Sequence, residues 1–154
     1  MSSTYAQVDA AVPVFEFDYS RCGNPTRMAL EKQIASLEGG KHALAASSGC
    51  AVTMLCTHLC KAGDHILAID DVYGGTGRFF RKMAVDIYGM EVDFVNMTDL
   101  SNVEAAFKDS TQMVWIETPT NPLLQVVDIE SISKICKEKG AILVVDNTFL
   151  TPVN

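Results

Sequence analysis

A run of five aliphatic residues that ends in a carboxylate constrains the fold of this sequence more than any other feature. Residues 141–145 read Ala-Ile-Leu-Val-Val, and Asp146 follows them directly. Because no polar residue alternates within it, the run predicts a strand buried on both faces, which is typical of parallel sheets covered by helices. A carboxylate at such a strand end needs a partner. We expect Asp146 to lie in the crevice where open α/β sheets bind ligands, and a structural ion pair with an arginine is the alternative.

Length, charge and composition predict one folded domain and disfavour two classes of partner. The 154 residues are enough for one hydrophobic core, and 48% hydrophobic with 20% charged residues is an ordinary globular composition. The formal net charge of −7 disfavours nucleic acid and anionic membranes, because both require clustered Lys and Arg. The most apolar window, residues 43–59, contains too many polar residues to span a bilayer.

The cysteines are predicted to be free thiols, and the chain is predicted to be cytoplasmic. Their number is odd and no secretory signal is visible at the amino terminus; the positions are Cys22, Cys50, Cys56, Cys60 and Cys136. Cys56 and Cys60, with His58 between them, invite interpretation as metal ligands. However, their segment is apolar at helical spacing and no second ligand pair follows it, so we predict no metal site.

Strand and helix patterns alternate along most of the chain. Residues 1–17 lack a clear period and are predicted to form an extended amino-terminal arm, whereas residues 18–154 are predicted to form an α/β domain. Helices are expected at 25–37, 51–60, 78–88, from a capping box at Ser101 and Glu104, and at 129–139; strands are expected at 65–69, 91–95, 113–117 and 141–145. This alternation, with short connections, predicts a three-layer domain around a mainly parallel sheet.

The loops that follow the strands are expected to meet at one edge of the sheet and to form a ligand site. Ser48, Gly49 and Cys50 open a helix, where free amides and the positive end of the helix dipole can hold a phosphate. Taken alone, this segment is more simply explained as a turn of small residues before a helix.

Three further side chains would complete such a site around a flat ring. Tyr73, next to two glycines, can stack on a ring, and Asn121, between two prolines, can hydrogen-bond a ring hydroxyl. Packing and turn formation are the ordinary roles of these two residue types. Asp146 can pair with a protonated ring nitrogen, and the combination favours pyridoxal phosphate as the cofactor.

Six motifs, in order from about Phe17 to Pro152, resemble the trans-sulfuration family of pyridoxal-phosphate enzymes of cysteine and methionine metabolism. They are residues 19–26, 37–40, 48–49, 71–76, 117–122 and 145–149. The sequence around Tyr73 and Glu117 is most similar to the cystathionine γ-lyase branch of the family. The resemblance implies part of the large, cofactor-binding domain of the fold-type I (aspartate aminotransferase-like) fold, with the carboxyl-terminal domain absent from this sequence.

The same resemblance implies a role for each matched residue. Ser48, Gly49 and the Cys50 amide would bind the phosphate, Tyr73 would stack on the ring and assist proton transfer, Asn121 would bind the 3-hydroxyl, Thr148 would support the ring, and Asp146 would keep the ring nitrogen protonated. Tyr19 and Arg21 would reach the phosphate in a neighbouring subunit of a dimer of dimers. Tyr73 and Asp146 are thus the implied catalytic residues.

By resemblance, the expected reaction is the γ-elimination of cystathionine, a sulfur amino acid, to cysteine, 2-oxobutanoate and ammonia. The family binds its cofactor covalently through a lysine in a Ser-x-Thr-Lys motif. No lysine of this sequence lies in that context; the eight are Lys32, Lys41, Lys61, Lys82, Lys108, Lys134, Lys137 and Lys139. We therefore expect a truncated carbon–sulfur lyase chain that is inactive alone.

Other interpretations remain open from the sequence. Cystathionine β-lyase and γ-synthase share nearly all of these motifs. The chain is alternatively a non-catalytic subunit that docks on a full-length homologue through Tyr19 and Arg21. An unrelated nucleotide-binding α/β domain would need a glycine-rich fingerprint after its first strand, and residues 47–50 lack one.

Overall fold

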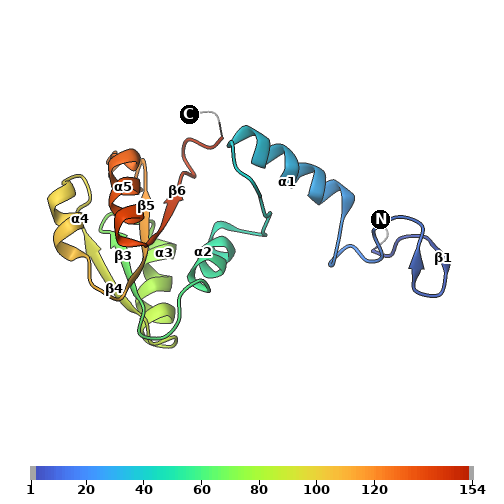
Figure 1. Ribbon diagram of the computed structural model, residues 1–154, viewed down its shortest axis with the longest axis horizontal. Helices are drawn as coiled ribbons and strands as arrows, with labels where there is room; N and C mark the ends of the chain where they lie inside the picture. The colour runs from blue at the N-terminus through green and yellow to red at the C-terminus, as the bar shows by residue number, and fades with distance from the viewer. Residues whose placement is uncertain (1–2, 153–154) are drawn as a thin grey trace. The chain divides into compact units, whose positions relative to one another are not determined.

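The computed structural model describes residues 3–152, which divide into two units. As far as it is described, the first unit consists of residues 3–47 and Pro152, and the second is Ser48–Thr151. The second unit holds the sheet and most of the helices (Figure 1). No helix of the described residues is long and apolar enough to cross a membrane.

The first unit contains a short hairpin and one helix. Strands β1 (Gln7–Asp9) and β2 (Val12–Pro13) pair antiparallel, so the segment predicted as an extended arm turns back on itself. Helix α1 (Pro25–Leu37) begins as predicted, because the Asn24 side chain accepts hydrogen bonds from the Thr26 and Arg27 amides at 2.9 and 3.1 Å. None of the α1 residues is buried.

The second unit is built on a four-stranded parallel sheet. Its strands are β3 (His65–Ile69), β4 (Glu91–Val95), β5 (Thr111–Glu117) and β6 (Ile142–Asp146), in the spatial order β4-β3-β5-β6. Every residue of β3 is buried, and so are all but one of β5, because both strands lie inside the sheet and contact helices on both faces. The predicted parallel α/β architecture is confirmed.

Strand β6 corrects one detail of the sequence prediction. The aliphatic run forms a parallel strand that ends in Asp146, as expected, but all five residues are only half-buried. The reason is its position: β6 pairs with β5 on one side and is the edge strand of the described sheet. An uninterrupted aliphatic run identifies a parallel strand, but it does not show where in the sheet the strand lies.

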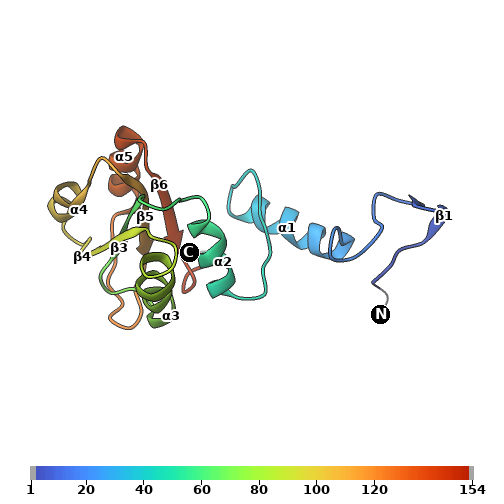
Figure 2. The same ribbon diagram turned by 90° about the horizontal axis from the view of Figure 1, so that it is seen from below.

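Helices cover both faces of the sheet and make a three-layer arrangement (Figures 1 and 2). One layer contains α2 (Gly49–Thr57), α3 (Gly74–Phe79) and the π-helical turn η1 (Phe80–Val85), and the other contains α4 (Leu100–Ala106) and α5 (Ile129–Lys139). Phe80 joins the first layer to the sheet, because its ring lies edge-on to Trp115 of β5 at 5.4 Å between centroids.

Three of the helices have bounds that differ from the sequence prediction. The helix expected from residue 78 begins at Gly74, and the segment from Phe80 is π-helical. Asp99, rather than Ser101, caps α4, because its carboxylate accepts the Ser101 amide at 2.9 Å. Helix α2 ends at Thr57, whereas α5 has the predicted bounds and ends at Gly140 with φ of 73°.

A polar cluster joins three strands at the edge of the sheet where they begin. The buried His65 of β3 places Nδ1 2.7 Å from the Thr111 hydroxyl of β5 and Nε2 3.3 Å from an Asp93 carboxylate oxygen of β4. Lys108 lies 2.8 Å from Asp93 and 3.1 Å from Glu91. Burial lowers the pKa of His65 and the Lys108 charge lowers it further, against the opposing effects of Asp93 and Glu91.

The chain should therefore lose stability as the pH falls through the range where histidine titrates. The folded pKa of His65 lies below its ordinary value of 6.5, so the unfolded chain takes up the proton first and stability declines from about pH 6.5 downward. His65→Gln should flatten this part of the profile, while costing about 1–3 kcal/mol through lost buried contacts. The measurement is thermal unfolding between about pH 7.5 and 5.5.

The matched control is His58→Gln, which removes an exposed imidazole. That variant should keep the decline seen in the unchanged chain. An equal decline in the His65 and His58 variants would show that another group is responsible.

Candidate functional site

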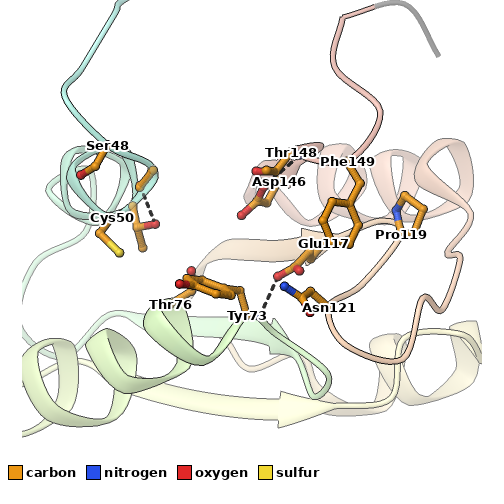
Figure 3. A pocket seen from close by; sticks show the side chains of 12 residues that line it. Ser48, Cys50, Tyr73, Thr76, Glu117, Pro119, Asn121, Asp146, Thr148 and Phe149 are labelled. Atoms are coloured by element: carbon orange, nitrogen blue, oxygen red, sulfur yellow. Dashed lines mark hydrogen bonds between the residues drawn. The ribbon is translucent and has the colours of Figure 1, made fainter.

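A hollow of about 320 Å³ opens where β3, β5 and β6 end (Figure 3). It lies wholly within the second unit, so every side chain that lines it belongs to Ser48–Thr151. The lining residues are Ser48, Gly49, Cys50, Thr53, Tyr73, Thr76, Glu117, Pro119, Asn121, Asp146, Thr148 and Phe149. This is the carboxyl edge of the parallel strands, where the sequence predicted a ligand site.

One wall of the hollow is the amino end of α2. Ser48 is the N-cap in an extended conformation, and its hydroxyl accepts the Ala51 amide at 3.2 Å. The amides of Gly49 and Cys50 belong to the first helical turn and have no acceptor within the helix. Together with the positive end of the helix dipole, these donors suit a phosphate group.

The opposite wall carries Asp146 at the end of β6. Its Oδ1 accepts hydrogen bonds from the Thr148 amide at 3.2 Å and from the Thr148 hydroxyl. These bonds fix the carboxylate and leave Oδ2 without a hydrogen bond from the described residues. An oriented carboxylate with one free oxygen suits a protonated ring nitrogen.

Glu117 is a site residue that the sequence analysis did not single out. It ends β5, stands opposite Asp146 in the parallel register, and is 5% exposed. Burial raises the pKa of Glu117, and the charges of Asp146 and Asp71 raise it further, while hydrogen bonds from the Tyr73 and Asn121 amides oppose the rise. The sequence pattern that pointed to Asp146, a carboxylate directly after an apolar strand, could also have identified Glu117.

The floor of the hollow is formed by Tyr73, whose ring lies close to Gly75. The Tyr73 amide donates to Glu117 at 2.8 Å, and 48% of the residue surface is exposed (Figure 3). A Cβ on Gly75 would come within 2.6 Å of the Tyr73 ring and 3.3 Å of the Cys50 sulfur. The missing side chain of Gly75 therefore makes room for the ring to lie against the backbone.

The residues of the hollow fit a flat cationic ring that carries a phosphate. Seven of the predicted site residues meet there, namely Ser48, Gly49, Cys50, Tyr73, Asn121, Asp146 and Thr148. Amide donors lie on one side and two carboxylates on the other, and no lysine or arginine is among the lining residues. The polarity across the hollow thus matches a ligand with a phosphate at one end and a protonated nitrogen at the other.

Two predicted site residues belong to the first unit. There the guanidinium carbon of Arg21 lies 5.0 Å from the centre of the Tyr19 ring, a cation–π contact. Neither residue is among those that line the hollow.

The segment considered for metal binding is part of the packed core. Cys60 is buried and Cys56 is half-buried, and burial, with the Asp64 charge, raises the pKa of Cys60 to about 11. Within the described part of the chain, no three His, Cys, Asp or Glu side chains are grouped to hold a metal ion.

A parallel sheet with helices on both faces and a ligand hollow at the carboxyl ends of its strands defines an α/β cofactor-binding domain. Residues 1–154 match the family described as Cys/Met metabolism PLP-dependent enzyme, where PLP is pyridoxal phosphate. The chain belongs to this family. The predicted family and the predicted cofactor are thereby confirmed.

The relatives of the chain include several cystathionine γ-lyases. The enzyme of Dictyostelium discoideum is 48% identical over 152 residues, which cover 99% of this chain and 39% of that protein. The human enzyme is 53% identical over 137 residues, which cover 88% of this chain and 34% of that protein. The chain therefore spans 34–39% of the length of these two relatives.

A solved structure supports the fold as well as the family. The crystal structure of cystathionine γ-lyase from Lactobacillus plantarum complexed with L-serine has a TM-score of 0.90 and 41% identity, covering 99% of this chain and 39% of that one. The chain therefore has the fold of the corresponding part of a pyridoxal-phosphate lyase.

Replacing Gly75 with alanine should weaken cofactor binding by about tenfold, or about 1.4 kcal/mol. The new methyl group would push the Tyr73 ring away from its place in the hollow. Gly74→Ala is the matched control, because a Cβ there meets nothing within 4 Å. Equilibrium dialysis of pyridoxal phosphate against both variants measures the difference. Equal dissociation constants would show that the ring position does not matter.

Proposed function

We propose that the hollow binds pyridoxal phosphate and that the chain forms the cofactor-binding part of a carbon–sulfur lyase of the cystathionine γ-lyase type. The observation that carries the proposal is the polarity of the hollow. The first-turn amides of α2 lie at one wall, the carboxylates of Glu117 and Asp146 at the other, and Tyr73 between them (Figure 3). The family and the γ-lyase relatives support the same assignment.

Each wall of the hollow has a separate task in this proposal. The Ser48 hydroxyl and the amides of Gly49 and Cys50 hold the phosphate. When bound, pyridoxal phosphate withdraws electrons from the Cα of an amino-acid substrate. Asp146, fixed by Thr148, holds the proton on the ring nitrogen that makes this withdrawal effective.

Two polar side chains complete the contacts with the ring. Asn121 offers an amide to the ring hydroxyl, and the Tyr73 ring stacks on the pyridine face. The exposed Tyr73 hydroxyl is then available to move a proton near the substrate. The proposed substrate is cystathionine, and cystathionine β-lyase or γ-synthase activity is the alternative within the family.

The hollow itself does not supply the lysine that the family uses to bind its cofactor covalently. None of the twelve lining residues is a lysine. We therefore propose that this chain holds pyridoxal phosphate without a covalent bond and turns over no cystathionine alone. This feature also favours a second candidate, a non-catalytic subunit that associates with a full-length homologue.

The proposed association of subunits rests on two residues of the first unit. Tyr19 and Arg21 would contribute to the phosphate site of a neighbouring subunit in a cytoplasmic homo-oligomer, a dimer of dimers. Residues 1–17 would act as an arm and residues 18–154 as the cofactor-binding domain. Copurification of the chain with a full-length homologue would support the non-catalytic candidate, and a chain that remains an isolated monomer beside that homologue would contradict it.

Comparing pyridoxal phosphate with pyridoxal tests the cofactor site. Pyridoxal phosphate should bind at least tenfold more tightly than pyridoxal, because the α2 amides donate to an ionised phosphate and such charge-assisted hydrogen bonds are strong. Ser48→Ala should weaken binding of pyridoxal phosphate but leave that of pyridoxal unchanged, since only the phosphate contacts Ser48. Ser47→Ala is the matched control, because Ser47 neither lines the hollow nor caps α2.

Borohydride treatment tests the absence of a covalent bond. Reduction of the loaded chain should leave no pyridoxyl group on any lysine, as measured by mass spectrometry of its peptides. Labelling of one specific lysine would contradict the proposal. Equal affinities for pyridoxal and its phosphate would argue against the α2 phosphate site.

A further inference from the structure

Two carboxylates connect the loops that carry Tyr73 and Asn121, and one of them lies outside the hollow. Asp71 follows β3 and belongs to the loop that leads to Tyr73, yet it is not among the lining residues. Its Oδ2 accepts a hydrogen bond from the Thr120 hydroxyl and another from the Leu123 amide at 3.0 Å. These donors flank Asn121 on both sides along the chain.

Glu117 makes the reciprocal connection from the other loop. It ends β5, and its carboxylate accepts the Tyr73 amide of the β3 loop at 2.8 Å. The two loops are thus joined crosswise, with Asp71 reaching the Asn121 loop and Glu117 reaching the Tyr73 loop.

The Asp71 bonds add to two backbone hydrogen bonds that close the Asn121 loop. The Thr120 amide donates to the Gln125 carbonyl at 3.0 Å, and the Leu124 amide donates to the Thr120 carbonyl at 3.1 Å. Thr120 is fully buried, and its hydroxyl also accepts the Gln125 amide at 2.9 Å, so Asp71 orients the group that closes the turn. Leu123 and Leu124 are 66% and 60% exposed and contribute little packing. Hydrogen bonds to an ionised acceptor are stronger than neutral ones. Without Asp71, the buried hydroxyl and one amide would lose their shared acceptor.

We propose that Asp71 is a positioning residue that locks the Asn121 loop against the Tyr73 loop, with Glu117 completing the brace. The inference rests on the proposed function in that the two loops present Asn121 and Tyr73 to the ring of pyridoxal phosphate. Asp71 itself touches no part of the hollow. Its effect on binding is therefore indirect, through the placement of Asn121.

Amide hydrogen exchange and cofactor affinity, measured on the full 154-residue chain, test the brace together. Asp71→Ala should raise exchange in residues 120–125 about tenfold, because local opening no longer breaks the Asp71 bonds. The dissociation constant for pyridoxal phosphate should rise about tenfold in the same variant. Asp71→Asn keeps an acceptor oxygen and should give intermediate values for both.

Asp70→Ala is the matched control, because within residues 3–152 this exposed carboxylate accepts a hydrogen bond only from the adjacent Asp71 amide. It should leave both readouts unchanged. Unchanged exchange in Asp71→Ala would overturn the brace. Faster exchange with an unchanged dissociation constant would show a merely structural role and overturn the positioning claim. If Asp71→Ala does not fold, Asp71→Asn decides by the same two measurements.

The outcome also separates this inference from the proposed function. If the unchanged chain does not bind pyridoxal phosphate, the proposed function fails and the positioning role fails with it. Faster exchange confined to the Asp71 variants would still establish the brace as a feature of the fold. If the unchanged chain binds and the Asp71 variants match it, the proposed function stands and the inference is overturned.

Discussion

The parallel register of β5 and β6 is the constraint on which the rest of the site depends. It sets the buried Glu117 opposite the half-buried Asp146, so two carboxylates end neighbouring strands. Burial raises the pKa of Glu117 and the Asp146 charge raises it further, while hydrogen bonding by the Tyr73 amide opposes the rise. The Tyr73 amide is the donor with an observed hydrogen bond to Glu117, so an interaction that stabilises this carboxylate also shapes the hollow.

The two edges of the sheet divide stability and ligand binding between them. At the edge where the strands begin, His65, Thr111, Asp93 and Lys108 connect three strands through paired groups. At the opposite edge, Asp146 has one carboxylate oxygen that accepts no hydrogen bond from the described residues. Groups left unsatisfied cost stability unless a ligand completes them.

Local patterns predicted much of the fold, because they depend on residues close in sequence. The aliphatic run of β3 and the capped, glycine-terminated α5 have the bounds expected from the sequence. Properties that depend on distant pairing were missed. The half-burial of β6 follows from its place at the sheet edge, and the link from Asp71 to Thr120 joins residues 49 positions apart. Ser48, Tyr73, Asn121 and Asp146 were predicted from their chemistry and Thr148 from the family resemblance, whereas Glu117 and the Asp71 bonds were found only in the structure.

A crystal structure of the chain grown with pyridoxal phosphate tests the proposed orientation of the cofactor in the hollow most directly. We expect the phosphate at the amides of Gly49 and Cys50 and the ring nitrogen beside Asp146, with Tyr73 against the ring face. A cofactor bound elsewhere, or one with its phosphate at the carboxylate wall, would contradict the account.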